Sequence, residues 1–226
     1  MNVLVVAAHP DDEVLGCGGA IARHAAAGDR VRILILAEGA TSRHAEAGAH
    51  AAEVSALRAA ARAAAEILGA EVEFESFADN RMDAVPRLKV VRAVERRIAE
   101  FAPRRVYTHH AGDVNVDHQV AHHAVVTACR PQPGHPVREL LFFEVASSSE
   151  WQPPGSGLAF APSVFIDIGA RLAAKRAALA AYAAELRPWP HPRSVEAVEH
   201  LARWRGASVG LEAAEAFMPG RRIETD

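Results

Sequence analysis

The stretch "AAHPDDEVLGCGG", residues 7–19, directly follows an apolar run and places a histidine, a proline and three consecutive acids at its end. Neighbouring carboxylates repel one another, and a turn from a strand into a helix requires none of them. The positive end of a helix dipole favours acids in the first turn, which would explain one or two of Asp11, Asp12 and Glu13. It does not explain three acids beside His9, so the stretch predicts a functional site at the end of a buried strand.

Segments typical of strands and of helices alternate from this stretch onward. Strands are expected at residues 2–8, 31–37, 72–77 and 105–110, and each is followed by a helix, at 13–27, 45–68, 86–100 and 117–130. This order predicts an α/β fold of Rossmann-like type, with a mostly parallel sheet and helices on both faces. Further strands are expected at 140–145 and 164–168, separated by a loop rich in Ser, Pro and Gly, and two more helices follow.

The chain has 226 residues, half of them hydrophobic, which suffices for one substantial core. We expect a single domain over residues 1–226, with a core at about 2–186 and a C-terminal helical extension at about 187–226. Gly16, Gly18 and Gly19 do not complete a dinucleotide-binding G-x-G-x-x-G pattern, because position 21 is Ile. They are better interpreted as small residues that let the first helix pack closely on the sheet.

Composition argues against several classes of partner. A net charge of -3 provides no basic field for a nucleic acid, and no apolar stretch reaches the roughly 18 residues of a membrane span. No basic leader precedes the motif, and Cys17 and Cys129 are too few for a disulfide framework and are expected to be buried. We therefore expect a cytoplasmic protein, and the sequence leaves a homo-oligomer open.

A second polar cluster, "YTHHAGDVNVDHQVAHHAV", follows the fourth expected strand at residues 107–125. In a doubly wound sheet that begins with strand order 3-2-1-4, the first and fourth strands are neighbours, and ligands bind beyond their carboxyl ends. His9 and His110 end these two strands, so both clusters should share one crevice. A catalytic zinc usually has three protein ligands and an open position, and His9, Asp12 and His118 supply one such set.

Other interpretations of the second cluster fit its spacing less well. Asp113, Asn115 and Asp117 imitate the start of a calcium loop, but its sixth position is His118 where Gly is required. His118 and His122 are four residues apart and could form a zinc pair on one helix face, yet the glutamate of such a helix is absent. His122 therefore stays a weaker alternative ligand.

The two motifs together resemble the PIG-L/LmbE-like family of zinc-dependent de-N-acetylases, over residue 2 to at least residue 186. The resemblance implies a Rossmann-type sheet and removal of acetyl groups from N-acetylated amino sugars and their conjugates. It implies that His9, Asp12 and His118 are the metal ligands and that Asp11 is the general base that accepts a proton from the attacking water. One Zn²⁺ per chain is the cofactor it implies, although other divalent ions could serve.

The sequence departs from the commoner family pattern at Asn115, where many members have a histidine that helps to stabilise the oxyanion. An amide can donate a hydrogen bond to an oxyanion but cannot carry a proton. Either Asn115 is a neutral donor, or His109 or His110 supplies the missing charge. Asp117 is expected to orient a neighbouring group, and it could instead cap a helix.

Candidate substrate contacts include His110 at the end of the fourth strand, and others lie in three further segments. Asp79, Asn80 and Arg81 follow the third strand and could bind sugar hydroxyls or a phosphate, or form a polar turn, and Arg58 is expected on a solvated helix face. The loop at 146–163, with Trp151, has the length of a lid, and Trp151 could stack on a sugar ring or pin the loop to the core. Residues 187–194 could add a wall to the pocket or only connect two helices.

These observations predict a cytoplasmic zinc hydrolase that removes an acetyl group from an N-acetylated sugar, such as a nucleotide sugar or a secondary-metabolite intermediate. Two alternatives remain at this point. One is an amidase of a larger sugar conjugate with the same metal chemistry, and the other is a non-catalytic nucleotide- or metal-binding module on a Rossmann-like sheet.

Overall fold

The computed structural model describes residues 1–40 and 47–224. Its centre is a seven-stranded sheet in the order β3-β2-β1-β4-β5-β7-β6. The strands span Asn2–Ala7 (β1), Arg30–Ala37 (β2), Glu71–Phe77 (β3), Arg105–His109 (β4), Glu139–Phe143 (β5), Val164–Asp167 (β6) and Ala214–Arg222 (β7). β1 to β5 pair in parallel, and β7 pairs antiparallel with both β5 and β6. The predicted α/β fold and the 3-2-1-4 order are confirmed.

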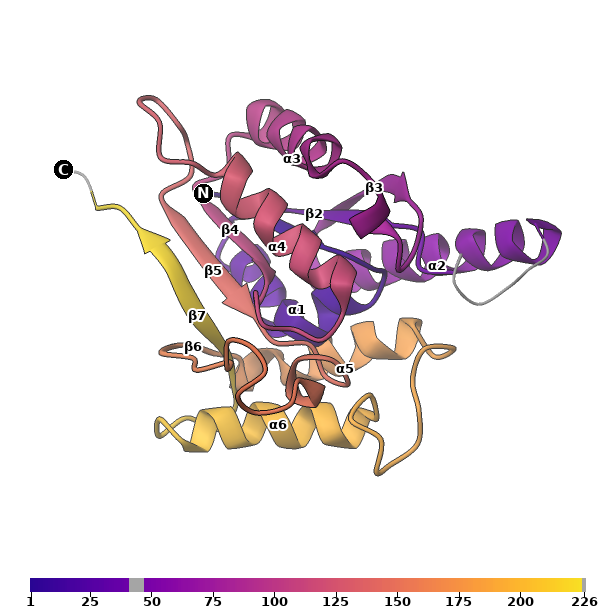
Figure 1. Cartoon of the computed structure of the whole chain (residues 1–226). Coiled ribbons are helices and arrows are strands. Elements are labelled where there is room, and N and C mark those ends of the chain that lie inside the picture. The colour runs from indigo at the N-terminus through magenta and orange to yellow at the C-terminus, as the bar shows by residue number, and fades with distance from the viewer. Residues whose placement is uncertain (41–46, 225–226) are drawn as a thin grey trace.

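Helices cover both faces of the sheet (Figure 1). One face carries α3 (Arg87–Phe101) and α4 (Val116–Ala128), and the other carries α1 (Asp12–Ala26), α2 (Ala47–Leu68) and α5 (Leu172–Ala181). Alternate residues of β1 are buried on opposite faces, Val3 and Val5 against α1 and Leu4 and Val6 against α3 and α4. A strand buried on both faces is expected to be apolar throughout, as this one is. Residues 45 and 46 of the expected second helix lie outside the described residues.

The glycines of α1 allow the close packing that the sequence predicts. A Cβ at Gly16 would lie 2.3 Å from Phe143 of β5, and a Cβ at Gly19 would lie 2.7 Å from Ile168. Both cysteines are buried free thiols, as expected. No helix among the described residues combines the length and the apolar character that crossing a membrane would require.

The predicted helical extension at 187–226 is wrong in its last part. α6 (Val195–Ala207) is a helix, but residues 214–222 form β7, which inserts into the sheet between β5 and β6. Pro219 and Gly220 mask this strand in the sequence, since both residues are rare inside strands. The register shift between Leu140 and Leu141 of β5 falls opposite these two residues, and such irregularities are where a sheet tolerates proline.

Candidate active site

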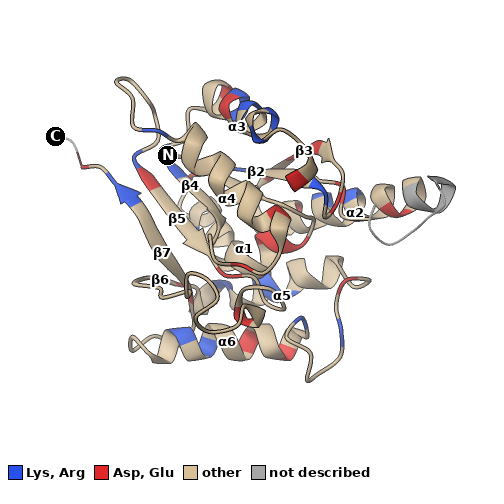
Figure 2. Cartoon of the chain, viewed as in Figure 1, with Lys and Arg blue, Asp and Glu red and all other residues tan. Residues whose placement is uncertain are grey.

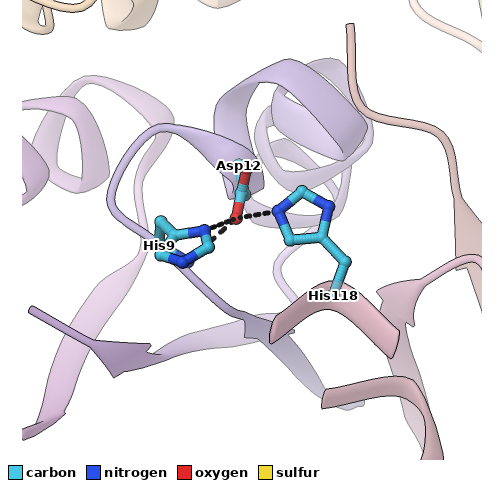
Figure 3. A group of neighbouring side chains, drawn as sticks. All are labelled: His9, Asp12 and His118. Atoms are coloured by element: carbon cyan, nitrogen blue, oxygen red, sulfur yellow. Dashed lines mark hydrogen bonds and ion pairs between the residues drawn. The ribbon is translucent and has the colours of Figure 1, made fainter. Parts of the chain in front are cut away.

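Two loops bring the metal-ligand candidates together at the carboxyl edge of β1 and β4. His9 follows β1, Asp12 begins α1, and His118 lies in the first turn of α4 (Figure 3). Asp12 Oδ2 lies 3.3 Å from His9 Nδ1 and 3.2 Å from His118 Nε2. Asp12 and His118 are fully buried and His9 nearly so. The three ligand atoms therefore surround one small space.

A carboxylate behind each imidazole fixes which ring nitrogen faces that space. His9 Nε2 lies 3.0 Å from Asp117 Oδ2 and 3.1 Å from Asp79 Oδ1, and His118 Nδ1 lies 3.1 Å from Asp113 Oδ1. A nitrogen that donates to a carboxylate leaves its partner nitrogen with a free lone pair. This carboxylate–histidine arrangement is typical of metal sites in proteins.

The atoms around this space fit a divalent cation. Asp12 Oδ1 and His118 Nε2 are buried and have no hydrogen-bond partner of good geometry among the described residues. His9, Asp12 and His118 have ligand atoms within 4.8 Å of one another, and so does a second set of His9, Asp79 and Asp117. In the second set, Asp117 already accepts hydrogen bonds from the backbone N–H groups of Asn80 and Met82. Within the described residues, only the first set therefore contains buried atoms that lack a hydrogen-bond partner.

Proximity shifts the pKa values of these groups strongly. Burial alone would raise the pKa of Asp12, but the charge of His118 holds it well below its usual range. Burial would lower the pKa of His118, yet Asp12 and Asp113 together raise it to about 9. Burial would likewise raise the pKa of Asp113, and its bonds with His118, Ser148 and Ser149 lower it to about 2. A bound cation would replace the proton that His118 otherwise keeps.

Asp11 lies beside this space in a strained backbone conformation. Its φ is 101°, a region that residues with a side chain seldom adopt. Its backbone N–H donates to Glu13 Oε2 (3.1 Å), and Tyr182 Oη donates to Glu13 Oε1 (2.6 Å). Burial raises the pKa of Asp11 to about 7, against the opposing charge of Arg193, whose Nη1 lies 2.9 Å from Asp11 Oδ2. A carboxylate with a pKa near neutrality is suited to both accept and return a proton.

Asn115 has a structural task in this arrangement. It is the N-cap of α4, where its Oδ1 accepts from the backbone N–H groups of Asp117 (2.8 Å) and His118 (3.4 Å). Its Nδ2 donates to Asn80 Oδ1 at 3.2 Å. The cap is thus Asn115 and not Asp117, whose carboxylate instead joins His9 to the 80–82 turn. The bond to Asn80 uses one of the two N–H groups of Nδ2, and only the second could donate to an oxyanion.

Of the other histidines in the second cluster, His109 lies against the ligand set, with its ring stacked on His118 at 4.0 Å between centroids, whereas His110 and His122 bond to backbone carbonyls. His109 accepts from the backbone N–H of Ala8, and burial lowers its pKa well below the usual value. His110 bonds through Nε2 to the carbonyl of Leu158 at 2.8 Å, and His122 bonds through Nδ1 to the carbonyl of His109 at 2.9 Å. A neutral, buried His109 cannot supply the positive charge for the oxyanion that the sequence suggested for either His109 or His110.

A small pocket of about 100 Å³ opens beside Asp11. Of the predicted substrate contacts, Asp79 and Asn80 line it, whereas Arg81, His110 and Trp151 do not. Trp151 is half exposed, and its ring packs edge-on against His191. The described lining residues are His9, Pro10, Asp11, Gly39, Leu57, Asp79, Asn80, Asn115, Glu185 and Arg193.

Sequence reasoning missed three functional candidates. Arg193 and Glu185 come from the segment between α5 and α6, and Asp113 was considered only as part of a calcium loop. The "HPRS" turn at 191–194, set among prolines, was the available signal for Arg193. Figure 2 shows Lys and Arg mixed with Asp and Glu over the outer helices, with acids gathered at the first turn of α1.

The chain is similar to known proteins in both sequence and fold. Residues 4–129 match the family model PIG-L, described as GlcNAc-PI de-N-acetylase. The uncharacterized deacetylase YaiS of Escherichia coli strain K12 is 30% identical over 170 residues, which is 73% of this chain and 80% of that protein.

Solved structures with the same fold include two kinds of enzyme. GalB, the 4-carboxy-2-hydroxymuconate hydratase from Pseudomonas putida KT2440, has a TM-score of 0.81 at 26% sequence identity, covering 100% of this chain and 98% of its own. The zinc-inhibited form of teicoplanin deacetylase Orf2 has a TM-score of 0.78 at 18% identity, covering 100% of both chains, and shows the fold alone.

Proposed function

Because the chain belongs to the PIG-L family of GlcNAc-PI de-N-acetylases, we propose that it is a metal-dependent hydrolase that removes the acetyl group from an N-acetylated amino sugar or sugar conjugate. The observation that carries this proposal is the ligand set of His9, Asp12 and His118 directly beside Asp11, in which two buried atoms have no hydrogen-bond partner in the described part of the chain. We further propose that the chain acts as a single domain.

The proposed reaction assigns each group one task. His9, Asp12 and His118 hold the ion, for which Zn²⁺ is our choice because imidazole and carboxylate are its common ligands. When bound, the ion would polarise the amide carbonyl and make the attacking water more acidic. Asp11 accepts the proton that this water loses as its oxygen bonds to the carbonyl carbon, and then gives it to the nitrogen as the C–N bond breaks. Acetate and a free amine are the products.

The charge of the pocket favours deacetylation over the hydratase activity of GalB. The described residues that line it include three carboxylates, Asp11, Asp79 and Glu185, and one guanidinium, Arg193. Apart from the charge of a bound cation, such a lining would repel a substrate with several carboxylates, as the name 4-carboxy-2-hydroxymuconate implies. A neutral amide that yields a cationic amine would be favoured. Hydration of an anionic substrate remains the second candidate function, because GalB shares the fold over the whole chain.

Polar groups in the pocket also suit a sugar. Asp79 and Asn80 contribute carboxylate and amide groups to the pocket lining, and such groups form hydrogen bonds with hydroxyls. Arg58, in contrast, bonds to the carbonyl of Glu75 and to Ser76 Oγ, outside the described lining. The pair of unmodified thiols agrees with a reducing compartment, for which we propose the cytoplasm.

The proposal is tested by measuring acetate and amine release from a panel of N-acetylglucosamine derivatives. The protein is stripped with a chelator and reloaded with one equivalent of Zn²⁺, Mn²⁺ or Co²⁺, and hydration of 4-carboxy-2-hydroxymuconate is followed in parallel. We expect acetate release only from reloaded protein. Hydration without acetate release from any member of the panel would replace the proposal with the second candidate.

Asp11→Asn tests the assignment of the base. The amide keeps the shape of the side chain but cannot accept a proton, so the rate should fall by roughly 10² to 10⁴. Metal content, measured by elemental analysis, should not change. A variant that retains its metal and turns over at nearly the normal rate would exclude Asp11 as the base.

A further inference from the structure

Three consecutive serines, Ser147 to Ser149, follow β5 and lead into a short 3-10 helix at Ser149–Trp151. The sequence marked this segment only as part of a lid. Each of the three hydroxyl groups bonds to a residue outside the serine run, and the proposed reaction uses none of them. Their partners are two charged side chains, Asp113 and Arg193, that reach the two halves of the candidate site.

Ser148 and Ser149 hold the carboxylate behind His118. Ser148 Oγ donates to Asp113 Oδ1, and Ser149 Oγ donates to Asp113 Oδ2 at 2.6 Å. Both serines are buried, and Asp113 is fully so. Asp113 Oδ1 lies 3.1 Å from His118 Nδ1 and also accepts from the backbone N–H of Asn115. The carboxylate that orients His118 is therefore fixed from the lid side by two hydroxyls.

Ser147 is linked to Asp11 through Arg193. Arg193 Nε donates to Ser147 Oγ at 2.7 Å, while Arg193 Nη1 donates to Asp11 Oδ2 at 2.9 Å. Glu150 keeps the run in place, because its two carboxylate oxygens accept from the backbone N–H groups of Ser147 and Ser148. The left-handed backbone of Ser147, with φ 66°, turns its hydroxyl in a different direction from the next two.

We propose that Ser147, Ser148 and Ser149 are positioning residues that fix both halves of the site from one rigid segment, His118 through Asp113 and Asp11 through Arg193. This inference rests on the metal site of the proposed function. A histidine binds a metal tightly when its ring is already held in the binding orientation. A carboxylate holds that ring less firmly once the hydroxyl groups that donate to it are removed.

The first test measures metal affinity without any substrate. In Ser148→Ala and in the Ser148→Ala/Ser149→Ala double variant, we expect Zn²⁺ affinity, measured by competition with a chromophoric chelator, to fall roughly 10- to 100-fold. Ser156→Ala is the matched control, since among the described residues Ser156 Oγ bonds only to Pro153 and Gln152 of the same loop, and its affinity should equal that of the unmodified chain. Thermal unfolding of each metal-free variant shows whether it is folded.

A double-mutant cycle separates positioning from general damage to the fold. Asp113→Ala should lower Zn²⁺ affinity by itself, and adding Ser149→Ala to it should cause no further loss, because Ser149 contacts Asp113 and not His118. Additive losses, or an unchanged affinity in the serine variants of a chain that binds Zn²⁺ normally, would overturn the proposal. An unmodified chain that binds no divalent ion would instead refute the metal site itself.

Ser147→Ala tests the link from Ser147 through Arg193 to Asp11. Its Zn²⁺ affinity should match that of the unmodified chain, while kcat should fall about 10-fold or more with KM little changed, since a misplaced base affects chiefly the transition state. Guanidinium salts should restore part of the activity of Arg193→Ala, because they replace the group that holds Asp11. A Ser147→Ala variant with normal kcat would show that this serine has no positioning role.

Discussion

Two buried clusters of charged side chains differ in how completely their polar atoms are paired. In the first, Lys175 of α5 and Glu215 of β7 form a buried ion pair of 2.6 Å. Lys175 Nζ also donates to the carbonyl of Leu15, and Glu215 accepts from the backbone N–H groups of Gly19 and Ala20. These two N–H groups lie just beyond Cys17, whose φ of -149° breaks α1, so Glu215 caps the second half of that helix.

The second cluster, His9, Asp12 and His118, is equally buried but incompletely paired. Asp12 Oδ1 and His118 Nε2 have no hydrogen-bond partner of good geometry among the described residues. An unpartnered buried polar atom costs on the order of 1 to 3 kcal/mol, and more when it is charged. Burial of charge alone therefore does not identify a functional site. The Lys175–Glu215 cluster satisfies itself and stabilises the fold, whereas the other cluster remains open for a ligand.

The largest expected effect separates the two clusters by stability. Lys175→Ala leaves Glu215 buried without its counter-charge, which should lower the free energy of unfolding by about 3–5 kcal/mol in urea titrations. The exposed Lys89 of α3 offers a matched control, and Lys89→Ala should stay within about 0.5 kcal/mol of the unmodified chain.

His118→Ala is the counterpart in the second cluster. It should abolish stoichiometric metal binding in elemental analysis, whereas Lys175→Ala should leave the metal content of the folded chain unchanged. If Lys175→Ala loses the metal as His118→Ala does, the distinction between the two clusters fails.

A second, smaller effect concerns pH and the metal-free chain. Burial raises the pKa of Asp11 to about 7 and that of Glu13 to about 8, and the ion pair with Asp12 raises that of His118 to about 9. Groups that bind protons more tightly when folded contribute stability at low pH and lose that contribution as the pH rises. We therefore expect the free energy of unfolding to fall, on the order of a few kcal/mol, between pH 5 and pH 9.

Metal should weaken this pH dependence, because binding requires a deprotonated His118 and becomes tighter as pH rises. Melting temperatures across that range, with and without Zn²⁺, test the expectation. A metal-free chain whose melting temperature rises steadily toward pH 9 would show that the second cluster does not hold its protons as argued.

The smallest expected effect is at Asn115, which lies at the edge of the site. Asn115→Ala removes the N-cap of α4 and should cost about 1 kcal/mol. Asn115→Ser retains a capping oxygen but lacks the amide, so it should keep both stability and kcat. If Asn115→Ser is as stable as the unmodified chain yet loses roughly 10²-fold in kcat, Asn115 is the oxyanion donor considered from the sequence.

Local patterns in the sequence were enough to predict much of the fold and of the site. The apolar runs of β1 and β2, and the helices that end near Gly28 and Gly69, follow from periodicity and turn residues. Parallel strands with crossover helices have few possible orders, so the adjacency of β1 and β4 also followed, and with it the meeting of His9 and His118.

Tertiary structure alone decided the rest, because it depends on contacts between segments with no common local pattern. β7 reads poorly as a strand by itself and is stabilised by antiparallel pairing with β5 and β6 on either side. His109 and His110 are adjacent in sequence, yet alternation along β4 sends one toward Ala8 and the other toward Leu158. Arg193 and the serines at 147–149 reach the site only because separate loops fold over it, and no spacing in the sequence records that approach.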